Sequence, residues 1–582
     1  MKSRLFMLTI LAFITALLAF RIKEASTEKR SFAKAREYRV KNLVRCTPDW
    51  NELKLWMEET DIPPIPGAGN YKWKISTNND SAQFYFNQGI NMYYSFHIIE
   101  AMASFRKAAK FDPGCAMLEW AQALAYGPNI NDVGYAASPE ALSAINKAVE
   151  LAGKGGTTDK EKILIKAQQE RYSEDSTQSR EKLNQLYADR MKEAYEKFSS
   201  DADVAALYAD ALMLQHPWDL WNNNGTPKPW TPLIRTVLEK LLSKTPNHPG
   251  ANHYYIHVME PSPYAAKAIP SADRLGKLTP GLSHTVHMPS HIYLRTGNYT
   301  KGVSVNESAV KSYEKTIPLY QPVTGNAFLY IIHNLHMQTN NSMMAGRSGY
   351  SSVSARETAN SIPIDYLAIP GGLGNYIQYV YMTPLLVDVR FGNWNQLLQQ
   401  PQPPAEQVYR NVLYRFGRGM ALSHQLRIAE AKYELEGIEQ LLKDSSLSAP
   451  FTPFSPATDG AVIAQHLLKG SIALQEKRYT DAITAFQNAV LTEENMVYNE
   501  PRDWMLNPKH YLADAYIKAG KYEDAKKTLQ KDLLNNNENG WALFGIWQVL
   551  TAQKKTAEAA KMLARFRNAF DKADIKLYGP VF

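Results

Sequence analysis

A spacing of small and bulky apolar residues that recurs about every 34 residues constrains the fold of this chain more than any other feature. Counting from Ala82, small residues fill positions 8, 20 and 27, bulky residues fill positions 11 and 24, and a proline fills position 32. These residues are Gly89, Met92, Ala101, Phe105, Ala108 and Pro113. Small residues let two helices approach closely and the proline ends the second helix, so the spacing predicts a helical hairpin.

The same spacing returns later in the chain. From Ala116 it is interrupted by an insertion around GPNINDVGYAA, and from Val462 it recurs in three further units, the last of which is weaker. The matching residues are Ala123, Tyr126, Ala141, Ile145 and Ala148, then Gly470, Tyr479, Ala482, Phe486 and Ala489, then Ala513, Tyr516, Gly520, Tyr522, Ala525 and Leu529, and finally Gly545, Ala557 and Ala564. One hairpin cannot bury its apolar face alone, so repeated units predict a stack.

The pattern resembles the tetratricopeptide repeat (TPR) family, over at least four units and, with insertions, over most of residues 80–575. The resemblance implies an all-α fold, a helix–turn–helix solenoid (superhelix) with long loop insertions. It also implies a concave groove lined by the first helix of each repeat, which in this family commonly holds a peptide or a partner's extended segment. The absence of sustained β alternation in the sequence agrees with an all-α chain.

The pattern divides the chain into seven segments. Residues 1–20 are predicted to be a signal peptide or membrane anchor, and residues 21–80 a basic juxtamembrane arm and linker. The repeat region comprises TPR-like repeats over 81–214, a Trp/Pro/Asn-rich insertion over 215–231, degenerate central repeats over 232–450 and C-terminal repeats over 451–575. Residues 576–582 form a tail.

The N-terminal residues carry the whole of the net charge of +8, since Lys2 to Arg45 contain eleven Lys and Arg and three acids. The balanced remainder predicts no nucleic-acid partner. The uncharged run from Leu5 to Phe20 is short for a membrane span and suits a signal peptide. We therefore predict an exported protein, periplasmic or held at the membrane by an uncleaved anchor. The basic arm favours the alternative of an anchor facing the cytoplasm.

Histidines gather in the central repeats. Eight of the thirteen lie in one span: His248, His253, His257, His284, His287, His291, His333 and His336. Gly297, Asn298 and Tyr299 fit the turn of a repeat that begins at Ser283. In that register, and in similar ones beginning near Asn252 and Ile332, all but His248 fall close to the start of a first helix. The resemblance to the TPR family implies that these positions face the groove.

The spacing of these histidines also suits metal binding, because residues three or four apart share one helical face. The predicted metal ligands are His253, His257, His284, His287, His291, His333 and His336, and imidazole shells suit Zn, Cu or Fe. Glu260 is a candidate general base, and Glu260 or Asp273 a candidate further ligand or outer partner. A groove that binds an acidic or polar partner, and simple packing, are the alternatives. Pro289 either kinks the middle helix or starts it, leaving His284 and His287 in a loop.

The insertion QHPWDLWNNNGTPKPW cannot be a repeat helix and is predicted to be an ordered loop. It would act as a lid or plug in the groove, or cover an exposed end of the stack. The residues predicted to contact a ligand in the groove are Trp218, Trp221, Trp230, Asn252, Tyr255 and Arg295.

Several short motifs also resemble those of bacterial exported repeat proteins, a resemblance that implies no particular activity. They are the span Ser104–Trp120, GPNIN, NHYYIH, HMPSHIY and EPRDW. We interpret GPNIN and EPRDW as turns that end helices. Neither Cys46 nor Cys115 lies in a redox motif.

Two functions follow. The first is an exported scaffold that binds a protein, peptide or small ligand in a groove lined by histidine and aromatic residues, with the membrane as a second partner. The second is a metal-dependent hydrolase or oxidoreductase, and a structural assembly factor whose groove is filled by the tryptophan loop is a third possibility. The arrangement of the histidine side chains distinguishes the first two functions. A metal-dependent enzyme needs at least three imidazoles around one point, whereas a scaffold needs an open groove with histidines spread along it.

Overall fold

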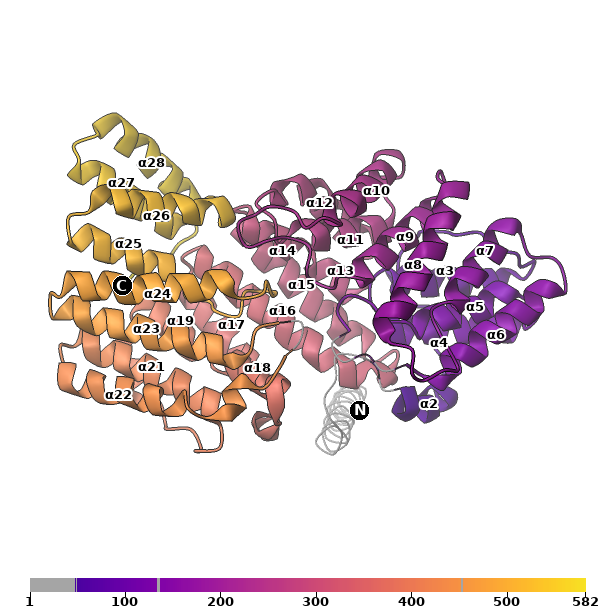
Figure 1. The fold of residues 1–582 in the computed structure, drawn as a ribbon, viewed down its shortest axis with the longest axis horizontal. Helices are drawn as coiled ribbons and strands as arrows, with labels where there is room; N and C mark the ends of the chain where they lie inside the picture. Colours follow the sequence, from indigo (N-terminus) through magenta and orange to yellow (C-terminus); the bar gives the residue numbers. More distant parts are fainter. Residues whose placement is uncertain (1–47, 49, 133–134, 136, 452–453) are drawn as a thin grey trace, which may run out of the picture.

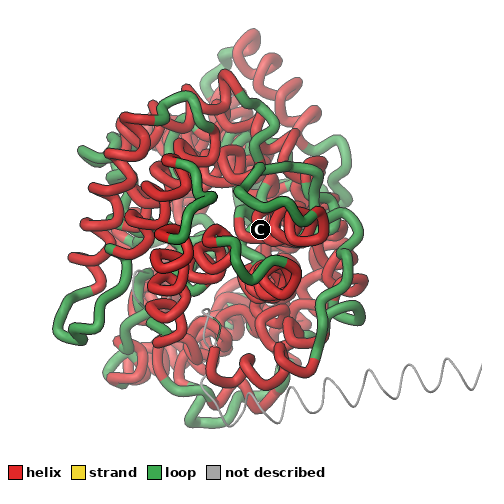
Figure 2. The backbone as a smooth tube through the Cα atoms, turned by 90° about the vertical axis from the view of Figure 1, so that its right-hand side faces the viewer, coloured by secondary structure: helices red, strands yellow, loops and turns green. Residues whose placement is uncertain are grey.

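The computed structural model describes residues 48, 50–132, 135, 137–451 and 454–582. Within these residues, helices are the only extended regular elements, since the two β-bridges, Trp221 with Pro227 and Phe451 with Phe454, are isolated (Figures 1 and 2). Many consecutive helices pack against each other in pairs, among them α3 with α4, α23 with α24 and α27 with α28. The prediction of an all-α, helical-repeat fold is confirmed.

The first third of the chain forms one end of the molecule (Figure 1). Its helices are α2 (Trp50–Glu59), α3 (Asp80–Tyr93), α4 (Ile98–Phe111), α5 (Ala116–Ala125), α6 (Pro139–Gly153), α7 (Asp159–Gln169), α8 (Arg180–Lys197) and α9 (Ala202–Leu214). The central helices are α10 (Thr231–Lys244), α11 (Pro249–Met259), α12 (Ile269–Leu278), α13 (Ser283–His287), α14 (Pro289–Arg295), α15 (Tyr299–Thr316), α16 (Thr324–Met344) and α17 (Ser348–Asn360).

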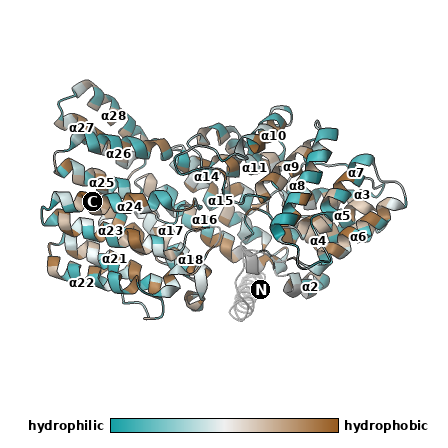
Figure 3. Ribbon diagram, in the orientation of Figure 1, coloured by the Kyte–Doolittle hydropathy of each residue, from teal (hydrophilic) through white to brown (hydrophobic). Residues whose placement is uncertain are grey.

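The remaining helices form the opposite end (Figure 1). They are α18 (Gly371–Tyr381), α19 (Thr383–Phe391), α20 (Trp394–Gln399), α21 (Val408–His424), α22 (Ile428–Leu441), α23 (Ala457–Gln475), α24 (Tyr479–Asn495), α25 (Pro508–Lys518), α26 (Tyr522–Asn535), α27 (Gly540–Ala552) and α28 (Thr556–Ala569). Most of them carry both apolar and polar residues along their length (Figure 3), as expected for helices buried on one side.

The small residues of the repeat are required by close helix contacts. A Cβ atom added to Gly89 on α3 would lie 2.4 Å from Cε1 of Phe105 on α4. The same pair recurs at the other end of the molecule, where a Cβ on Gly470 would lie 2.4 Å from Cε1 of Phe486. The spacing of glycine and aromatic residue in the sequence is therefore a spacing of contacts between paired helices.

The described residues form two large apolar cores and two small ones, and the histidines lie on helices of both large cores. One core runs from Trp50 to Val323 and the other from Ile332 to Leu577. The histidine-bearing helices α11 and α14 contribute to the first core, and α16 contributes to the second. The histidines thus occupy a junction between two halves of the stack.

Residues 60–79 are not a free linker, because Ile62, Ile65, Trp73 and Ile75 are buried in the first core. The predicted signal or anchor and the basic arm up to residue 47 lie outside the described residues. In the described part of the chain, no helix has the length and apolar character needed to cross a membrane.

Candidate metal centre

Helix α11 positions the first two histidines. Pro249 occupies the first turn, where its missing N–H costs no hydrogen bond, and the side chain of His248 caps the helix by accepting from the backbone N–H of Ala251 at 3.1 Å. The helix then places His253 and His257 one turn apart on the same face. Both side chains are buried, with exposures of 0 and 1%.

Pro289 divides the next histidine helix in two. Helix α13 ends at His287 and α14 begins at Pro289, with Met288 between them in a right-handed helical conformation. The backbone N–H of Met288 still bonds to the carbonyl of His284 at 3.0 Å. His284 and His287 are therefore helical, as expected for an interrupted helix and not for an approach loop.

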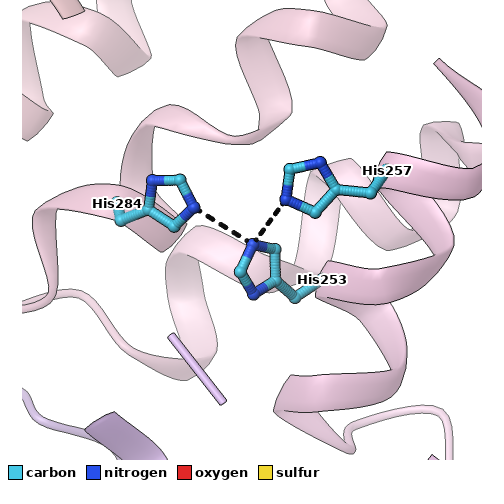
Figure 4. A group of neighbouring side chains, drawn as sticks. All are labelled: His253, His257 and His284. Carbon is cyan, nitrogen blue, oxygen red and sulfur yellow. Dashed lines mark hydrogen bonds between the residues drawn. The ribbon is translucent and has the colours of Figure 1, made fainter. Parts of the chain in front are cut away.

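The first histidine triad comprises His253, His257 and His284 (Figure 4). The Nε2 atom of His253 lies 3.1 Å from Nε2 of His257 and 3.2 Å from Nε2 of His284. Three ring nitrogens from α11 and α13 therefore point at one position.

The second triad comprises His287, His291 and His333, from α13, α14 and α16. The Nε2 atoms of His287 and His291 lie 3.0 Å apart, and the ring of His333 lies 4.7 Å from that of His287. The two triads are neighbours, since the ring centroids of His284 and His287 are 5.5 Å apart. His287 and His291 are buried and His333 is partly buried.

In His253 and His287 the other ring nitrogen, Nδ1, meets a hydrogen-bond acceptor. Nδ1 of His253 donates to the carbonyl oxygen of Tyr94 at 2.7 Å. Nδ1 of His287 lies 3.0 Å from Oδ1 of Asn306, whose own NH₂ donates to a backbone carbonyl of α15. A proton held at Nδ1 leaves the Nε2 lone pair free to face the centre of a triad.

Two buried carboxylates, Glu260 and Glu500, lie between the triads. Nδ1 of His257 is 3.0 Å from Oε1 of Glu260 and 3.2 Å from Oε1 of Glu500. His291 is close to the same two carboxylates, with Nδ1 3.2 Å from Oε2 of Glu260 and Nε2 3.7 Å from Oε2 of Glu500. The hydroxyl of Tyr498 donates to Oε2 of Glu260 at 2.9 Å. The carboxylates thus join the triads.

Burial dominates the electrostatics of this cluster. It lowers the pKa of His253, His284 and His287 well below the usual range, an effect that the neighbouring imidazoles reinforce. Burial likewise lowers the pKa of His291 to about 3. Burial, with the nearby carboxylate of Glu500, raises the pKa of Glu260 well above its usual range. The imidazoles of these four histidines are therefore neutral near pH 7, the state in which imidazole binds metals.

Other predicted ligands lie outside the two triads. Nε2 of His336 instead contacts Sδ of Met505 at 3.1 Å. Asp273 accepts a hydrogen bond from the hydroxyl of Tyr293 at 2.6 Å, away from the imidazoles.

The predicted groove residues have mixed roles. The indole of Trp218 packs edge-on against His257, with centroids 5.4 Å apart, and its N–H donates to the carbonyl of Ile130 at 2.8 Å. The loop between α9 and α10 therefore covers the cluster. The others make structural contacts: Trp221 with the Val258 carbonyl, Trp230 with the ring of His216, Asn252 with two backbone carbonyls, Tyr255 with Glu239 and Arg295 with Asn535.

A hollow lies beside the first triad, with about 370 Å³ of unfilled space that includes the open solvent at its mouth. Its wall includes Phe96, His97, Glu100, Asp132 and Tyr330. The ring of Phe96 stacks on His284 at 5.6 Å and lies 4.4 Å from the ring of His253. Phe96 has a φ of +55°, the left-handed region that bulky side chains rarely adopt. One aromatic ring thus separates the hollow from the imidazoles.

The sequence analysis missed Glu500 and Tyr498 as members of this site. Both lie in the loop between α24 and α25, far from the histidines in the chain. Glu500 is the first residue of EPRDW, which we interpreted as a helix-ending turn. The signal in the sequence that could have indicated Glu500 was the presence of a carboxylate in EPRDW, a motif that the repeat pattern does not explain.

Comparison with known proteins leaves the function open. None of the protein-family models matches the chain, and no curated protein matches it. Three solved structures with low similarity are a human IFIT1 dimer with m7Gppp-AAAA, the P58(IPK) TPR domain and the APC/C hetero-tetramer Cut9-Hcn1. Their identities are 11, 11 and 12%, with TM-scores of 0.31, 0.20 and 0.25. The matches cover 85, 82 and 86% of this chain and 91, 99 and 97% of the others. Similarity this low carries nothing about function.

Proposed function

We propose that this protein is a metalloprotein whose central repeats bind two transition-metal ions, one in each histidine triad. The observation that carries the proposal is the position of His253. Its Nδ1 proton is committed to the carbonyl of Tyr94, so its Nε2 lone pair points at two further Nε2 atoms at 3.1 and 3.2 Å.

A bound cation accounts for this arrangement better than hydrogen bonding does. His257 has two carboxylates at its Nδ1 atom, which favour a proton there and an Nε2 lone pair facing that of His253. Two lone pairs about 3 Å apart repel unless a positive ion lies between them. Protonation of His253 is opposed by burial, which lowers its pKa well below the usual range.

The carboxylates support the same proposal. Glu260 is fully buried and Glu500 is 7% exposed, and two buried carboxyl groups side by side can both be charged only beside compensating positive charge. Metal ions bound to the triads would supply it. The contacts of His257 and His291 with Glu260 and Glu500 would then be the outer hydrogen bonds that orient metal-bound imidazoles and raise their basicity.

The ligand set favours Zn, Cu or Fe, since imidazole suits all three. Three protein ligands leave a coordination position open for water, oxygen or a substrate, as in catalytic sites. Such an ion supplies Lewis-acid or redox chemistry, which makes a hydrolase or an oxidoreductase the activity that we propose. A bound cation would oppose the raised pKa of Glu260. Glu260, held by Tyr498 and next to both His257 and His291, would then be positioned to accept a proton from a bound molecule.

A scaffold with an imidazole-lined groove has less support. Groove residues need to be accessible, whereas five of the six triad histidines are at most 2% exposed and Trp218 covers His257. We therefore place the metal centre ahead of the groove. Binding of a protein partner by other surfaces of the repeats stays a prediction.

We also propose that the protein is exported, on the basis of the apolar run from Leu5 to Phe20 that follows Lys2 and Arg4. Fractionation of the producing cells tests this. The protein is expected in the periplasmic fraction, or in the membrane fraction with its repeats on the outer side of the inner membrane. Recovery of the repeats in the cytoplasmic fraction, or their protection from protease added to spheroplasts, would contradict export.

Metal analysis tests the proposed centre. The protein is purified without a histidine tag or chelator, loaded with Zn²⁺, Cu²⁺ or Fe²⁺ in turn, desalted and analysed by mass spectrometry. We expect about two equivalents of one metal, about one in either His253→Ala or His287→Ala, and none in the double variant. His466→Ala, outside the cluster, is the control and should retain both. A folded protein that takes up none of the three metals would overturn the proposal.

A further inference from the structure

A second hollow, distant in the chain from the histidines, has the chemistry of a binding site for an organic cation. It lies between α18, α21 and α23, beside the loop that follows α24, and opens to solvent, with about 340 Å³ of unfilled space that includes the solvent at its mouth. Its wall includes Tyr376, Tyr379, Tyr409, Phe451, Met496 and Asp503. Nothing in the proposed metal centre uses these six residues.

Asp503 is the one charged residue among those that line this hollow. Its Oδ1 atom accepts from the side-chain amide of Asn499 at 2.7 Å. Its Oδ2 atom is buried and has no hydrogen-bond partner within the described part of the chain. A buried carboxylate oxygen without a partner is costly, and burial accordingly raises the pKa of Asp503 to about 7. A cation placed in the hollow would remove that cost.

The aromatic rings provide the apolar part of the site. Tyr376 stacks on Phe451 with centroids 5.5 Å apart, and Tyr379 stacks on Tyr409 at 6.1 Å. The hydroxyl of Tyr379 is fixed because it accepts the backbone N–H of Met505 at 2.9 Å. Aromatic rings beside a carboxylate attract a cation whose surface is apolar, through the ring quadrupole and direct charge attraction.

We propose that this hollow binds a small organic cation, a protonated or quaternary amine whose charged group lies against Asp503 and whose alkyl groups contact the tyrosines. None of the described residues that line the hollow is Lys or Arg, so its charge favours a cation over an anion. An inorganic cation would instead need several oxygen ligands, and the wall offers one carboxylate.

Calorimetry with choline chloride tests the proposal, with 3,3-dimethylbutan-1-ol as the uncharged molecule of the same shape. We expect choline to bind at one site per chain and the alcohol to bind at least about tenfold more weakly. Asp503→Asn should weaken choline binding about tenfold or more, and Phe451→Ala, at the partly buried edge of the wall, should weaken it while leaving folding intact. Glu436→Gln, an exposed acid on α22, should have no effect.

Melting curves identify any variant that fails to fold, so that the comparison uses folded proteins only. Equal binding of choline and the alcohol would overturn the charge preference. Failure of folded wild-type protein to bind choline at all would overturn the site. Neither result depends on whether the histidine triads hold metal.

Discussion

Oε1 of Glu500 lies 3.2 Å from Nδ1 of His257, although the two residues belong to different halves of the repeat stack. His257 is on α11, whereas Glu500 is in the loop after α24. The contact completes a cluster that the central repeats alone leave without its second carboxylate. Removal of the charge of Glu500 is therefore the most direct test of whether the C-terminal half contributes to the proposed metal site.

Glu500→Gln keeps the size of the side chain and removes its charge. We expect metal affinity to fall about 10- to 100-fold, because the oriented imidazoles lose an outer carboxylate. Competition with a chromophoric chelator measures the affinity. Glu494→Gln, on the same side of the stack but bonded to Lys509 and Lys531, is the matched control. Indistinguishable affinities in the two variants would show that Glu500 does not support the metal.

Phe96→Ala should open the path from the hollow to the first triad. Removal of the ring that stacks on His284 is expected to speed the binding of azide to copper-loaded protein at least about tenfold. Stopped-flow absorbance follows the reaction. Phe84→Ala removes an exposed ring from the adjacent helix α3 and should leave the rate unchanged. If both variants behave like the wild type, azide reaches the metal by another route.

The repeat itself can be tested at two glycines. Gly89→Ala places a methyl group against Phe105, and overpacking of this kind costs about 1–3 kcal/mol. Gly153→Ala, at the end of α6, meets no atom within 4 Å and should be neutral or stabilising by up to about 1 kcal/mol. Thermal melting measures both. Equal shifts would mean that the glycine is not required by helix contact.

Glu493 predicts a dependence of stability on pH. Burial alone would raise its pKa, but Arg502 and Lys509 outweigh burial and lower the pKa to about 2 from the usual 4.5. A lowered folded-state pKa stabilises the fold above pH 4.5, and this contribution is lost as pH falls toward 2. Above pH 5, the free energy of unfolding of the wild type should exceed that of Glu493→Gln by on the order of 3 kcal/mol. Melting curves at pH 6 and pH 3 measure the difference in stability between the two proteins, which should be smaller at pH 3. An equal difference at both pH values would show that the charge of Glu493 does not stabilise the fold.

The sequence predicted the hairpins well, because Gly89 with Phe105 and Gly470 with Phe486 are local pairs whose spacing directly reflects helix contact. It also indicated which histidines share a helical face, since His253 and His257 are one turn apart. The register of a repeat does not predict, however, which other segments of the chain pack against that helical face. Trp218 and the loop that carries Glu500 cover it here, so residues expected along a groove lie inside the molecule.

Glu500 could not be predicted for the same physical reason. Its role depends on how the C-terminal repeats meet the central ones, which is set by the accumulated rotation of the stack and by insertions of irregular length. His336 shows the converse: its spacing from His333 suited a shared metal, yet its Nε2 atom turns to Met505.

The separation of Glu500 from the histidines has a consequence for biosynthesis. Since chains are made from the N-terminus, all six imidazoles of the triads leave the ribosome well before residue 500 does. A nascent or truncated chain would therefore expose a histidine-rich surface without the carboxylate that orients it. The proposed site is complete only once the chain extends past residue 500, so metal loading would report that the two halves of the molecule have folded together.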